Sequence, residues 1–538
     1  MPKTIQIFDT TLRDGTQGEK VSFSAEDKVR IAERLDQFGV DYIEGGWPGS
    51  NPKDMAFFDK IRGQRFEHAK IVAFGSTCRG NLSPEEDANL QALIAAETPA
   101  VSIFGKSWLL HVKDALKITP EKNLEIIHDS IVFLKKHGKE VIYDAEHFFD
   151  GYKHDPEYAV ETLLQAEKAG ADVLVLCDTN GGTMTEDLAR IVTEVAGKVQ
   201  ARLGIHAHND SELAVANTLA AVDAGCRHVQ GTINGYGERC GNANLCSVIP
   251  NLQLKKGYHC IEDSELPNLS SLSRFVSEVA NLTPDNKLPY VGRSAFAHKG
   301  GIHVSAVLKN EQTYEHVRPE SIGNSRRVLV SDLSGKSNIH YKSQELGFDL
   351  NKNGESTPQI VQKLKELENS GYQFEAAEAS FELLVKQMTD PWAEFFTLEG
   401  FRVIVEKNAA GDSRSEATIR INVNGSIEHS AAEGSGPVHA LDQALRKALV
   451  KFYPDIAGIQ LQDYKVRVLN GKDGTDAGVR VLIDSGEDSE SWGTVGVSQN
   501  IIDASWQALS DSFNYYLMHR QPVELQEKAT GSDAKQSG

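Results

Sequence analysis

Two histidines separated by one residue are the most suggestive chemical feature of this 538-residue chain. His206 and His208 stand in the sequence His-Ala-His-Asn-Asp, at the end of a short apolar run. Two-residue spacing on a strand puts both imidazoles on one face, about 7 Å apart along the chain, where both can reach one metal ion. Such a pair also arises by chance in a chain with 17 histidines, so the prediction depends on context.

Two other polar loops could complete a metal site. The segment Asp9–Gly15 (DTTLRDG) places Arg13 and Asp14 side by side, and Gly237–Asn244 (GERCGNAN) offers the amide oxygen of Asn242. Each loop alone could be a solvated ion pair or a simple turn. Together with the two histidines, they form a mixed oxygen and nitrogen set that suits Mn, Mg, Zn or Co and does not choose among them. We therefore predict a divalent metal site.

An alternation of strands and helices must position these loops. The predicted strands are Ile5–Asp9, Tyr42–Gly45, Ile71–Gly75, Ala100–Phe104, Val141–Asp144, Val173–Cys177, Leu203–His206 and Val229–Ile233. The predicted helices between them include Asp27–Phe38, Asn123–His137, Pro156–Ala169, Thr185–Val195 and Leu213–Ala224. Ser24 and Asp27 have the spacing of a capping box.

This alternation predicts an α/β fold with a closed (β/α)8 TIM barrel over residues 1–280. The polar clusters follow strands one, five, six, seven and eight at their carboxyl ends, where such a barrel builds its active site. A doubly wound open sheet is the alternative, and it would gather the polar residues near one switch point.

The composition changes after the barrel. Residues 281–395 have mostly helical patterns, which predict helical linker subdomains, whereas 396–525 contain short alternating strands. There the run Ile419–Gly425, a glycine-rich turn and a helix with Gln443-Ala444-Leu445 parallel a second set, Val481–Gly486 with Gln507-Ala508-Leu509. We predict a C-terminal α+β regulatory domain with internal pseudo-symmetry that binds an effector or pairs subunits. The small, polar tail 526–538 is predicted to be disordered.

Composition excludes several classes of function. The formal net charge of −20 repels phosphate backbones and anionic membranes, so we expect no nucleic acid and no membrane partner. No apolar run approaches the ~20 residues of a membrane span. The six cysteines have no CxxC spacing and are interpreted as reduced thiols of a cytoplasmic protein.

Five motifs, in this order along the chain, resemble one enzyme family. They are DTTLRDGTQ (Asp9–Gln17), HAHND (His206–Asp210), GERCGN (Gly237–Asn242), GIH (Gly301–His303) and YEHVRPESIGNSRRVL (Tyr314–Leu329). With them the chain resembles the 2-isopropylmalate, homocitrate and citramalate synthases over nearly its whole length. Those enzymes are metal-dependent acyltransferases that join acetyl-CoA to a small 2-oxo acid, and the resemblance implies the same barrel, linker subdomains and regulatory domain.

The resemblance also implies roles for the site residues. Asp14, His206, His208 and Asn242 would hold the metal. Arg13 would stabilise the alkoxide as charge develops, and Thr179 would contact the 2-oxo acid. Glu146 and His303 are the candidates for the base that takes a proton from acetyl-CoA, and Tyr314 would assist, for example by activating water for thioester hydrolysis. In the resembling enzymes the region of His303 and Tyr314 reaches into the partner's barrel, so a homodimer is implied.

Three further segments are most similar to the citramalate-forming members: Ile103–Trp108 (IFGKSW), Ile142–Gly151 (IYDAEHFFDG) and Gly474–Leu482 (GTDAGVRVL). This similarity implies that the 2-oxo acid is pyruvate, on an entry to isoleucine synthesis, and that isoleucine is the inhibitory effector. Phe104 and Tyr143, near the ends of strands four and five, could supply the bulk that excludes larger acids, or could belong to the barrel core.

Two other interpretations are open. A 2-isopropylmalate or homocitrate synthase would perform the same chemistry on a larger 2-oxo acid. A catalytically dead barrel could act as an amino-acid-binding regulator, but such a protein would be expected to have lost a ligand or the charged loop, and this chain keeps both.

Overall fold

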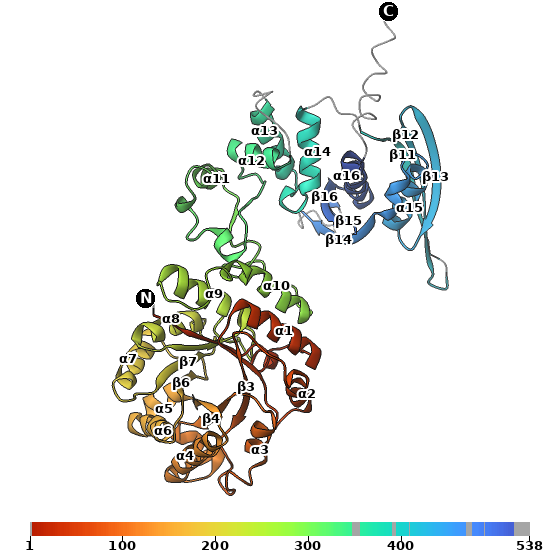
Figure 1. Ribbon diagram of the computed structural model, residues 1–538. Helices are drawn as coiled ribbons and strands as arrows, with labels where there is room; N and C mark the ends of the chain where they lie inside the picture. Colours follow the sequence, from red (N-terminus) through yellow and green to blue (C-terminus); the bar gives the residue numbers. More distant parts are fainter. Residues whose placement is uncertain are drawn as a thin grey trace, which may run out of the picture. The chain divides into compact units, whose positions relative to one another are not determined.

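Eight parallel strands in the first half of the chain close into a barrel (Figure 1). The computed structural model describes residues 3–346, 356–389, 394–407, 409–469, 476–488 and 490–520. The strands are β1 (Gln6–Asp9), β2 (Tyr42–Gly46), β3 (Lys70–Ser76), β4 (Ala100–Lys106), β5 (Glu140–Glu146), β6 (Val173–Asp178), β7 (Arg202–Ala207) and β8 (His228–Gly231). All eight predicted strands are confirmed. Because β8 pairs with β1, the open-sheet alternative is excluded.

Helices follow the strands and surround the barrel. They are α1 (Ala25–Phe38), α2 (Pro52–Ile61), α3 (Ala88–Ala95), α4 (Pro120–Lys136), α5 (Phe148–His154), α6 (Pro156–Lys168), α7 (Thr185–Ala196), α8 (Ala214–Ala224), α9 (Leu245–Pro250) and α10 (Leu269–Val279). Helix α1 begins at the predicted capping box, in which the Ser24 and Asp27 side chains each accept a hydrogen bond from the other residue's backbone N–H. It ends at Gly39, whose φ of 93° favours glycine.

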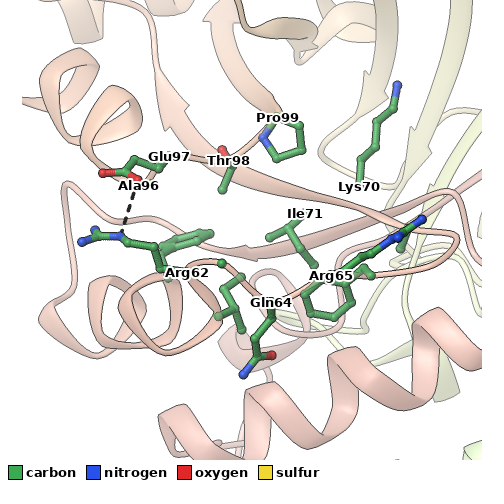
Figure 2. Close-up of a pocket in the computed structure, with 14 residues that line it drawn as sticks. Arg62, Gln64, Arg65, Lys70, Ile71, Ala96, Glu97, Thr98 and Pro99 are labelled. Atoms are coloured by element: carbon green, nitrogen blue, oxygen red, sulfur yellow. Dashed lines mark ion pairs between the residues drawn. The ribbon is translucent and has the colours of Figure 1, made fainter.

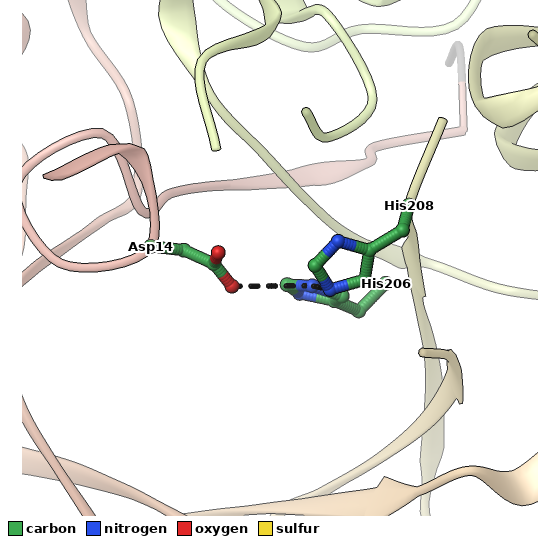
Figure 3. A group of neighbouring side chains, drawn as sticks. All are labelled: Asp14, His206 and His208. Atoms are coloured by element: carbon green, nitrogen blue, oxygen red, sulfur yellow. Dashed lines mark hydrogen bonds and ion pairs between the residues drawn. The ribbon is translucent and has the colours of Figure 1, made fainter. Parts of the chain in front are cut away.

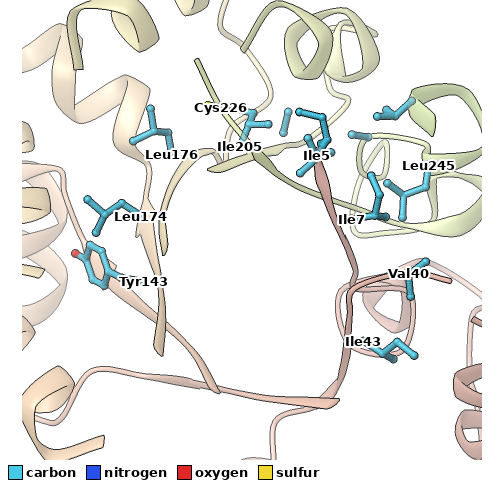
Figure 4. Close-up of a cluster of buried hydrophobic side chains, with 14 of the residues drawn as sticks. Ile5, Ile7, Val40, Ile43, Tyr143, Leu174, Leu176, Ile205, Cys226 and Leu245 are labelled. Carbon is cyan, nitrogen blue, oxygen red and sulfur yellow. The ribbon is translucent and has the colours of Figure 1, made fainter. Parts of the chain in front are cut away.

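Side chains along each strand alternate between the barrel interior and the surrounding helices. The interior apolar cluster consists of Phe8, Tyr42, Val72, Ala100, Ile142, Val173, Val175 and Cys177. Outward-facing side chains join the larger core beneath the helices, and Figure 4 shows Tyr143, Leu174 and Leu176 on that outer side of the wall. On β5, Asp144 and Glu146 therefore share the interior face with Ile142, whereas Tyr143 lies on the opposite face.

The described residues of the remaining chain form a second compact unit, made of residues 297–314 and the described residues between 327 and 520, while 315–326 belong with the barrel. Its first part contains the short parallel pair β9 (Ala297–His298) and β10 (Arg327–Val328). The helices of this part are α11 (Gly301–Val307), α12 (Lys336–Glu345), α13 (Ser356–Asn369) and α14 (Glu378–Thr389). Among the described residues no helix is both long and apolar enough to cross a membrane.

The predicted internal repeat appears as two antiparallel three-stranded sheets, each followed by a helix. The first contains β11 (Thr397–Lys407), β12 (Ser413–Val423), β13 (Ser426–Gly434) and α15 (Pro437–Leu449). The second contains β14 (Gln460–Val468), β15 (Val479–Glu487), β16 (Glu490–Ser498) and α16 (Ile501–Arg520). In each copy an additional strand, β13 or β16, stands where the sequence predicted only a turn. The tail 526–538 lies outside the described residues.

Candidate metal and substrate site

Asp14, His206 and His208 meet at the carboxyl end of the barrel, although they are far apart in the sequence (Figure 3). The Nε2 atoms of the two histidines lie 3.3 Å apart, and Nε2 of His206 lies 3.5 Å from Oδ2 of Asp14. One candidate ligand atom from each residue lies within 4.8 Å of the others, and all three residues are buried. Two imidazole nitrogens and a carboxylate oxygen that converge in this way can hold one divalent cation.

The charge states of these groups suit a metal. Burial alone would raise the pKa of the Asp14 carboxyl, but neighbouring Arg13 and the two histidines lower it to about 2. Burial, with a further contribution from His206, lowers the pKa of His208 to about 3. At neutral pH the site therefore presents an ionised carboxylate and a neutral His208 imidazole, which are the forms that bind metals.

Asn242 supplies a further candidate ligand. Its Nδ2 donates to Oδ1 of Asp14 over 3.1 Å, and its buried Oδ1 has no hydrogen-bond partner within the described part of the chain. The loop reaches this position through Gly241, whose φ is 87° and where a Cβ would lie 2.0 Å from the Gly235 carbonyl oxygen. A buried carbonyl oxygen without a donor needs an explanation, and a bound cation would satisfy it. The residues present thus fit a divalent metal.

Arg13 is held beside this group by two carboxylates. Its Nε donates to Oε2 of Glu44 over 2.6 Å, and its Nη1 donates to Oδ2 of Asp14 over 2.9 Å. The guanidinium lies 3.8 Å from the centroid of the Phe74 ring. Burial disfavours the charge, but Glu44 and Asp14 together raise the pKa of Arg13, so it remains a cation. A fixed, mostly buried cation stabilises negative charge that develops on a neighbouring oxygen.

Sequence reasoning missed Glu44, which is fully buried in β2. Its Oε2 also accepts a hydrogen bond from Thr10, over 2.5 Å, so one carboxylate positions both Arg13 and the turn after β1. The available signal was a charged residue inside the otherwise apolar run Tyr42–Gly45, because burial of a carboxylate is costly unless it is paired.

Glu146 lies at the end of β5 and forms an ion pair with Lys106, at the end of β4. Two residues before Lys106, Phe104 stacks on Phe74 with ring centroids 5.5 Å apart. Trp47 contacts both phenylalanines edge-on. An aromatic wall thus extends from Arg13 to Lys106, and Phe104 is placed where it can limit the size of a substrate.

Thr179 and Tyr143 differ in how they relate to this region. The Thr179 hydroxyl accepts a hydrogen bond from the backbone N–H of His147, over 2.9 Å, directly beside Glu146. Helix α7 begins after Met184, so Thr179 does not cap it. Tyr143 is fully buried on the helix side of β5, so of the two roles left open for it the structure supports the core and not the substrate pocket. The pleat of the strand turns it away from the interior.

His303 and Tyr314 belong to the second compact unit. Their ring centroids are 4.3 Å apart, and Tyr314 is 46% exposed. The structure thus brings these two predicted residues together with each other. A paired, accessible imidazole and phenol are groups that can transfer protons.

A cavity of about 380 Å³ lies near the amino ends of β3 and β4, away from the metal site (Figure 2). Its lining includes Ile71 and Pro99, near the starts of β3 and β4, and its rim carries the ion pair of Arg62 with Glu97 at 3.7 Å. None of the predicted site residues lines it.

Comparison with known proteins assigns the three parts of the chain. The HMGL-like family matches residues 4–276, the homocitrate synthase post-HMGL domain-like family matches 290–372, and the LeuA allosteric (dimerisation) domain matches 375–517. The fold and the site therefore define a TIM barrel of the HMGL-like family that carries these two further domains.

Individual related proteins show which members of this family the chain resembles in sequence. The (R)-citramalate synthase of Geobacter sulfurreducens is 57% identical, over 97% of this chain and 99% of that protein. The (R)-citramalate synthase of Aquifex aeolicus is 55% identical, over 96% and 98%. A probable 2-isopropylmalate synthase of Methanopyrus kandleri is 32% identical, over 96% and 98%. The chain belongs to the family of the citramalate and 2-isopropylmalate synthases.

Proposed function

We propose that this chain is a citramalate synthase, which condenses acetyl-CoA with pyruvate to give citramalate and free CoA. The observation that carries the proposal is that sequence identity is much higher to citramalate synthases than to 2-isopropylmalate synthases. Five (R)-citramalate synthases are 47–57% identical to the chain, whereas 2-isopropylmalate synthases are 31–32% identical over similar lengths. The complete set of metal-binding and charged groups at the barrel mouth argues against a catalytically dead regulator.

In this proposal Asp14, His206 and His208 hold a divalent cation, with Asn242 as the fourth ligand; Mn, Mg, Zn and Co all suit this set. When bound there, such a cation supplies Lewis-acid polarisation of a 2-oxo acid carbonyl. Arg13, fixed by Glu44, stabilises the negative charge that develops on the keto oxygen as the new carbon–carbon bond forms.

The acetyl methyl group is a weak carbon acid, so a positioned base must take its proton. Glu146, at the interior end of β5, is our candidate, and His303 is the second candidate. Tyr314, in ring contact with His303, assists in activating water that hydrolyses the thioester and releases CoA. We assign His303 and Tyr314 to the partner's barrel in a homodimer, in keeping with the LeuA allosteric (dimerisation) domain match.

Substrate size and regulation complete the proposal. Phe104, on the interior face of β4, limits the space beside the 2-oxo acid. Thr179, whose hydroxyl accepts a hydrogen bond from the backbone N–H of His147, next to Glu146 in the chain, contacts the same substrate. We divide the chain into a catalytic domain (1–280), helical linker subdomains (281–395) and a regulatory domain (396–525) that binds isoleucine. Feedback by isoleucine would place the cytoplasmic enzyme at an entry to branched-chain amino-acid synthesis.

The test is release of free CoA by the purified full-length protein, with Mn²⁺ present and with pyruvate, 2-oxoisovalerate or 2-oxoglutarate as the second substrate. Pyruvate is expected to give the highest kcat/KM, with citramalate as the product. Preference for 2-oxoisovalerate or 2-oxoglutarate would reassign the chain to the 2-isopropylmalate or homocitrate synthases. CoA release with none of the three would favour the regulator.

A further inference from the structure

A continuous chain of hydrogen bonds crosses the barrel interior and ends at a metal-binding histidine. The Ser102 hydroxyl on β4 donates to Oδ2 of Asp144 on β5, over 2.6 Å. The Nε2 of Gln230 on β8 donates to Oδ1 of Asp144, over 3.0 Å. The Oε1 of Gln230 then lies 2.9 Å from Nδ1 of His206 on β7. Residues on four different strands thus form one relay.

The relay is buried throughout. Ser102 and Gln230 are fully buried, Asp144 is 5% exposed and His206 is 6% exposed. Deeper positions on the same interior faces are apolar, as with Ile142 on β5 and Ala100 on β4. Buried polar groups are costly to keep unless all are satisfied, and a satisfied network specifies one arrangement. The hydrogen-bonded network therefore specifies one arrangement of these side chains inside the barrel.

The direction of each hydrogen bond fixes the next one. A carboxylate accepts only, so Asp144 draws the amide nitrogen of Gln230 towards itself, and the amide oxygen of Gln230 must then face His206. Only an N–H can bond to that oxygen, so Nδ1 of His206 carries the ring proton. Its Nε2 is left with a free lone pair, directed at His208 and Asp14. A histidine binds metal through its unprotonated nitrogen.

We propose that Asp144 and Gln230 are positioning residues that set the tautomer and ring orientation of His206 for metal binding. Asp144 acts through Gln230 and not by direct contact with metal or substrate. The inference deepens the proposed function, because it concerns the same metal site, but it makes a claim about cation affinity that can be measured without turnover.

The second histidine provides an internal contrast. Nδ1 of His208 is buried and has no hydrogen-bond partner among the described residues, so no comparable relay fixes that ring. Disruption of the relay should therefore affect one of the two imidazoles. Loss of such an outer partner typically costs 10–100-fold in metal affinity, which is less than the loss of a ligand.

The experiment is calorimetric titration of the full-length protein with Mn²⁺, supported by the visible absorption spectrum of the Co²⁺ form, which reports ligand geometry. Gln230→Met keeps the side-chain length but removes donor and acceptor, and should weaken Mn²⁺ binding about 10–100-fold. Asp144→Asn should weaken it by a similar factor, because the new amide no longer dictates the orientation of Gln230. Ser130→Ala removes a buried hydroxyl on α4, outside the relay, and is the matched control expected to leave Mn²⁺ affinity unchanged.

Two double variants test whether Asp144 acts on His206 through Gln230. In the Gln230→Met background, Asp144→Asn should cause no further loss, since Asp144 acts only through residue 230. The exchange Asp144→Asn with Gln230→Glu restores a carboxylate acceptor for His206 and an amide donor behind it, at unchanged net charge. It should recover Mn²⁺ affinity to within a few-fold of the wild type and restore the Co²⁺ spectrum.

Three results would overturn the proposal: unchanged Mn²⁺ affinity in Gln230→Met, a further loss from Asp144→Asn in that background, or an exchange variant no tighter than the single variants. Thermal unfolding identifies variants that fail to fold. If the wild-type protein binds Mn²⁺ and the variants behave as expected but no citramalate is formed, the proposed function fails while the relay stands.

Discussion

Lys106 and Glu146 form an ion pair across the carboxyl ends of β4 and β5, with side chains 19% and 24% exposed. Each occupies the last position of its strand, directly beside its partner in the parallel register. The pair fixes the Glu146 carboxylate at the mouth of the barrel while leaving it accessible to substrate. Neither residue belongs to the metal-binding group, so base and metal functions can be tested separately.

The first prediction concerns this pair. Glu146→Gln should lower kcat about 10²–10⁴-fold, because the amide cannot accept a proton. Lys106→Met keeps the carboxylate but frees its position, so the loss should be smaller. Steady-state CoA release measures both, and Mn²⁺ affinity should remain at the wild-type value. Glu146→Gln with full turnover would remove Glu146 from the mechanism and leave His303 as the base.

The second prediction concerns the metal. His208→Ala removes one of three converging ligands and should abolish stoichiometric Mn²⁺ binding, and turnover with it. Elemental analysis of the purified protein, together with CoA release, checks this. His154→Ala, an exposed histidine on α5, is the control. Wild-type activity and metal content in His208→Ala would end the proposal.

Substrate size is the subject of the third prediction. Phe104→Ala should raise kcat/KM for 2-oxobutanoate relative to pyruvate. The extra methylene of 2-oxobutanoate needs space that the Phe104 ring fills in the wild-type protein. The expected change in the ratio is about 10-fold or more. Tyr143→Phe is the matched control, since its hydroxyl lies buried on the helix side of β5 and the ratio should not change. An unchanged ratio in Phe104→Ala would place specificity on other residues.

A fourth prediction links pH to stability in the second unit. Asp511 on α16 accepts a hydrogen bond from Ser380 over 2.6 Å, and burial raises its pKa to about 7. The unfolded carboxyl has a pKa near 3.9, so the folded state holds the proton more tightly. The contribution of Asp511 to the free energy of unfolding is therefore fully present below about pH 4 and is lost as pH rises through 7.

It follows that Asp511→Asn should be more stable than the wild type at pH 8, by on the order of 1–4 kcal/mol, with a difference that shrinks towards pH 5. Urea unfolding monitored at both pH values measures this. Asp455→Asn, an exposed position in the same unit, is the control. Equal stability of Asp511→Asn and wild type at pH 8 would contradict the prediction.

The fifth prediction concerns regulation. A chain truncated near Gly400 lacks both three-stranded sheets and should no longer be inhibited by isoleucine, because those residues form the proposed effector domain. Mn²⁺ affinity of the barrel shows whether the truncated protein is folded. Inhibition that persists in a folded truncated protein would assign the effector site elsewhere.

Much of the barrel could be predicted from the sequence because its strands are buried on both faces and stand out as short apolar runs between amphipathic helices. Helix α1 was equally clear, since its capping box is a local signal. Strand β13 was missed because its sequence, SIEHSAAEG, has few β-branched or aromatic residues and forms by pairing with β12.

Within the site, the metal-binding residues could be recognised in the sequence from their residue types and spacing. The residues that position them could not. Gln230 and Asp144 are recognisable only from their distance to His206, which depends on strand pairings that local patterns do not specify. The assignment of Tyr143 to the substrate pocket could have been avoided from the sequence. Tyr143 stands three positions before Glu146, so on a pleated strand the two side chains must face opposite ways. The assignment of one to the interior excludes the other.

The barrel closes where β8 pairs with β1, through four register pairs from Gln6 with His228 to Asp9 with Gly231. Asp14 follows one side of this pairing, and the two histidines come from β7, beyond its other side. A cation bound by these residues would link the loop after β1 to the end of β7, across the β8–β1 pairing. Any ligand that binds only the folded form stabilises that form by an amount that grows with the ratio of its free concentration to its Kd. Bound metal would therefore stabilise the closed barrel, and removal of the metal by a chelator should lower its stability.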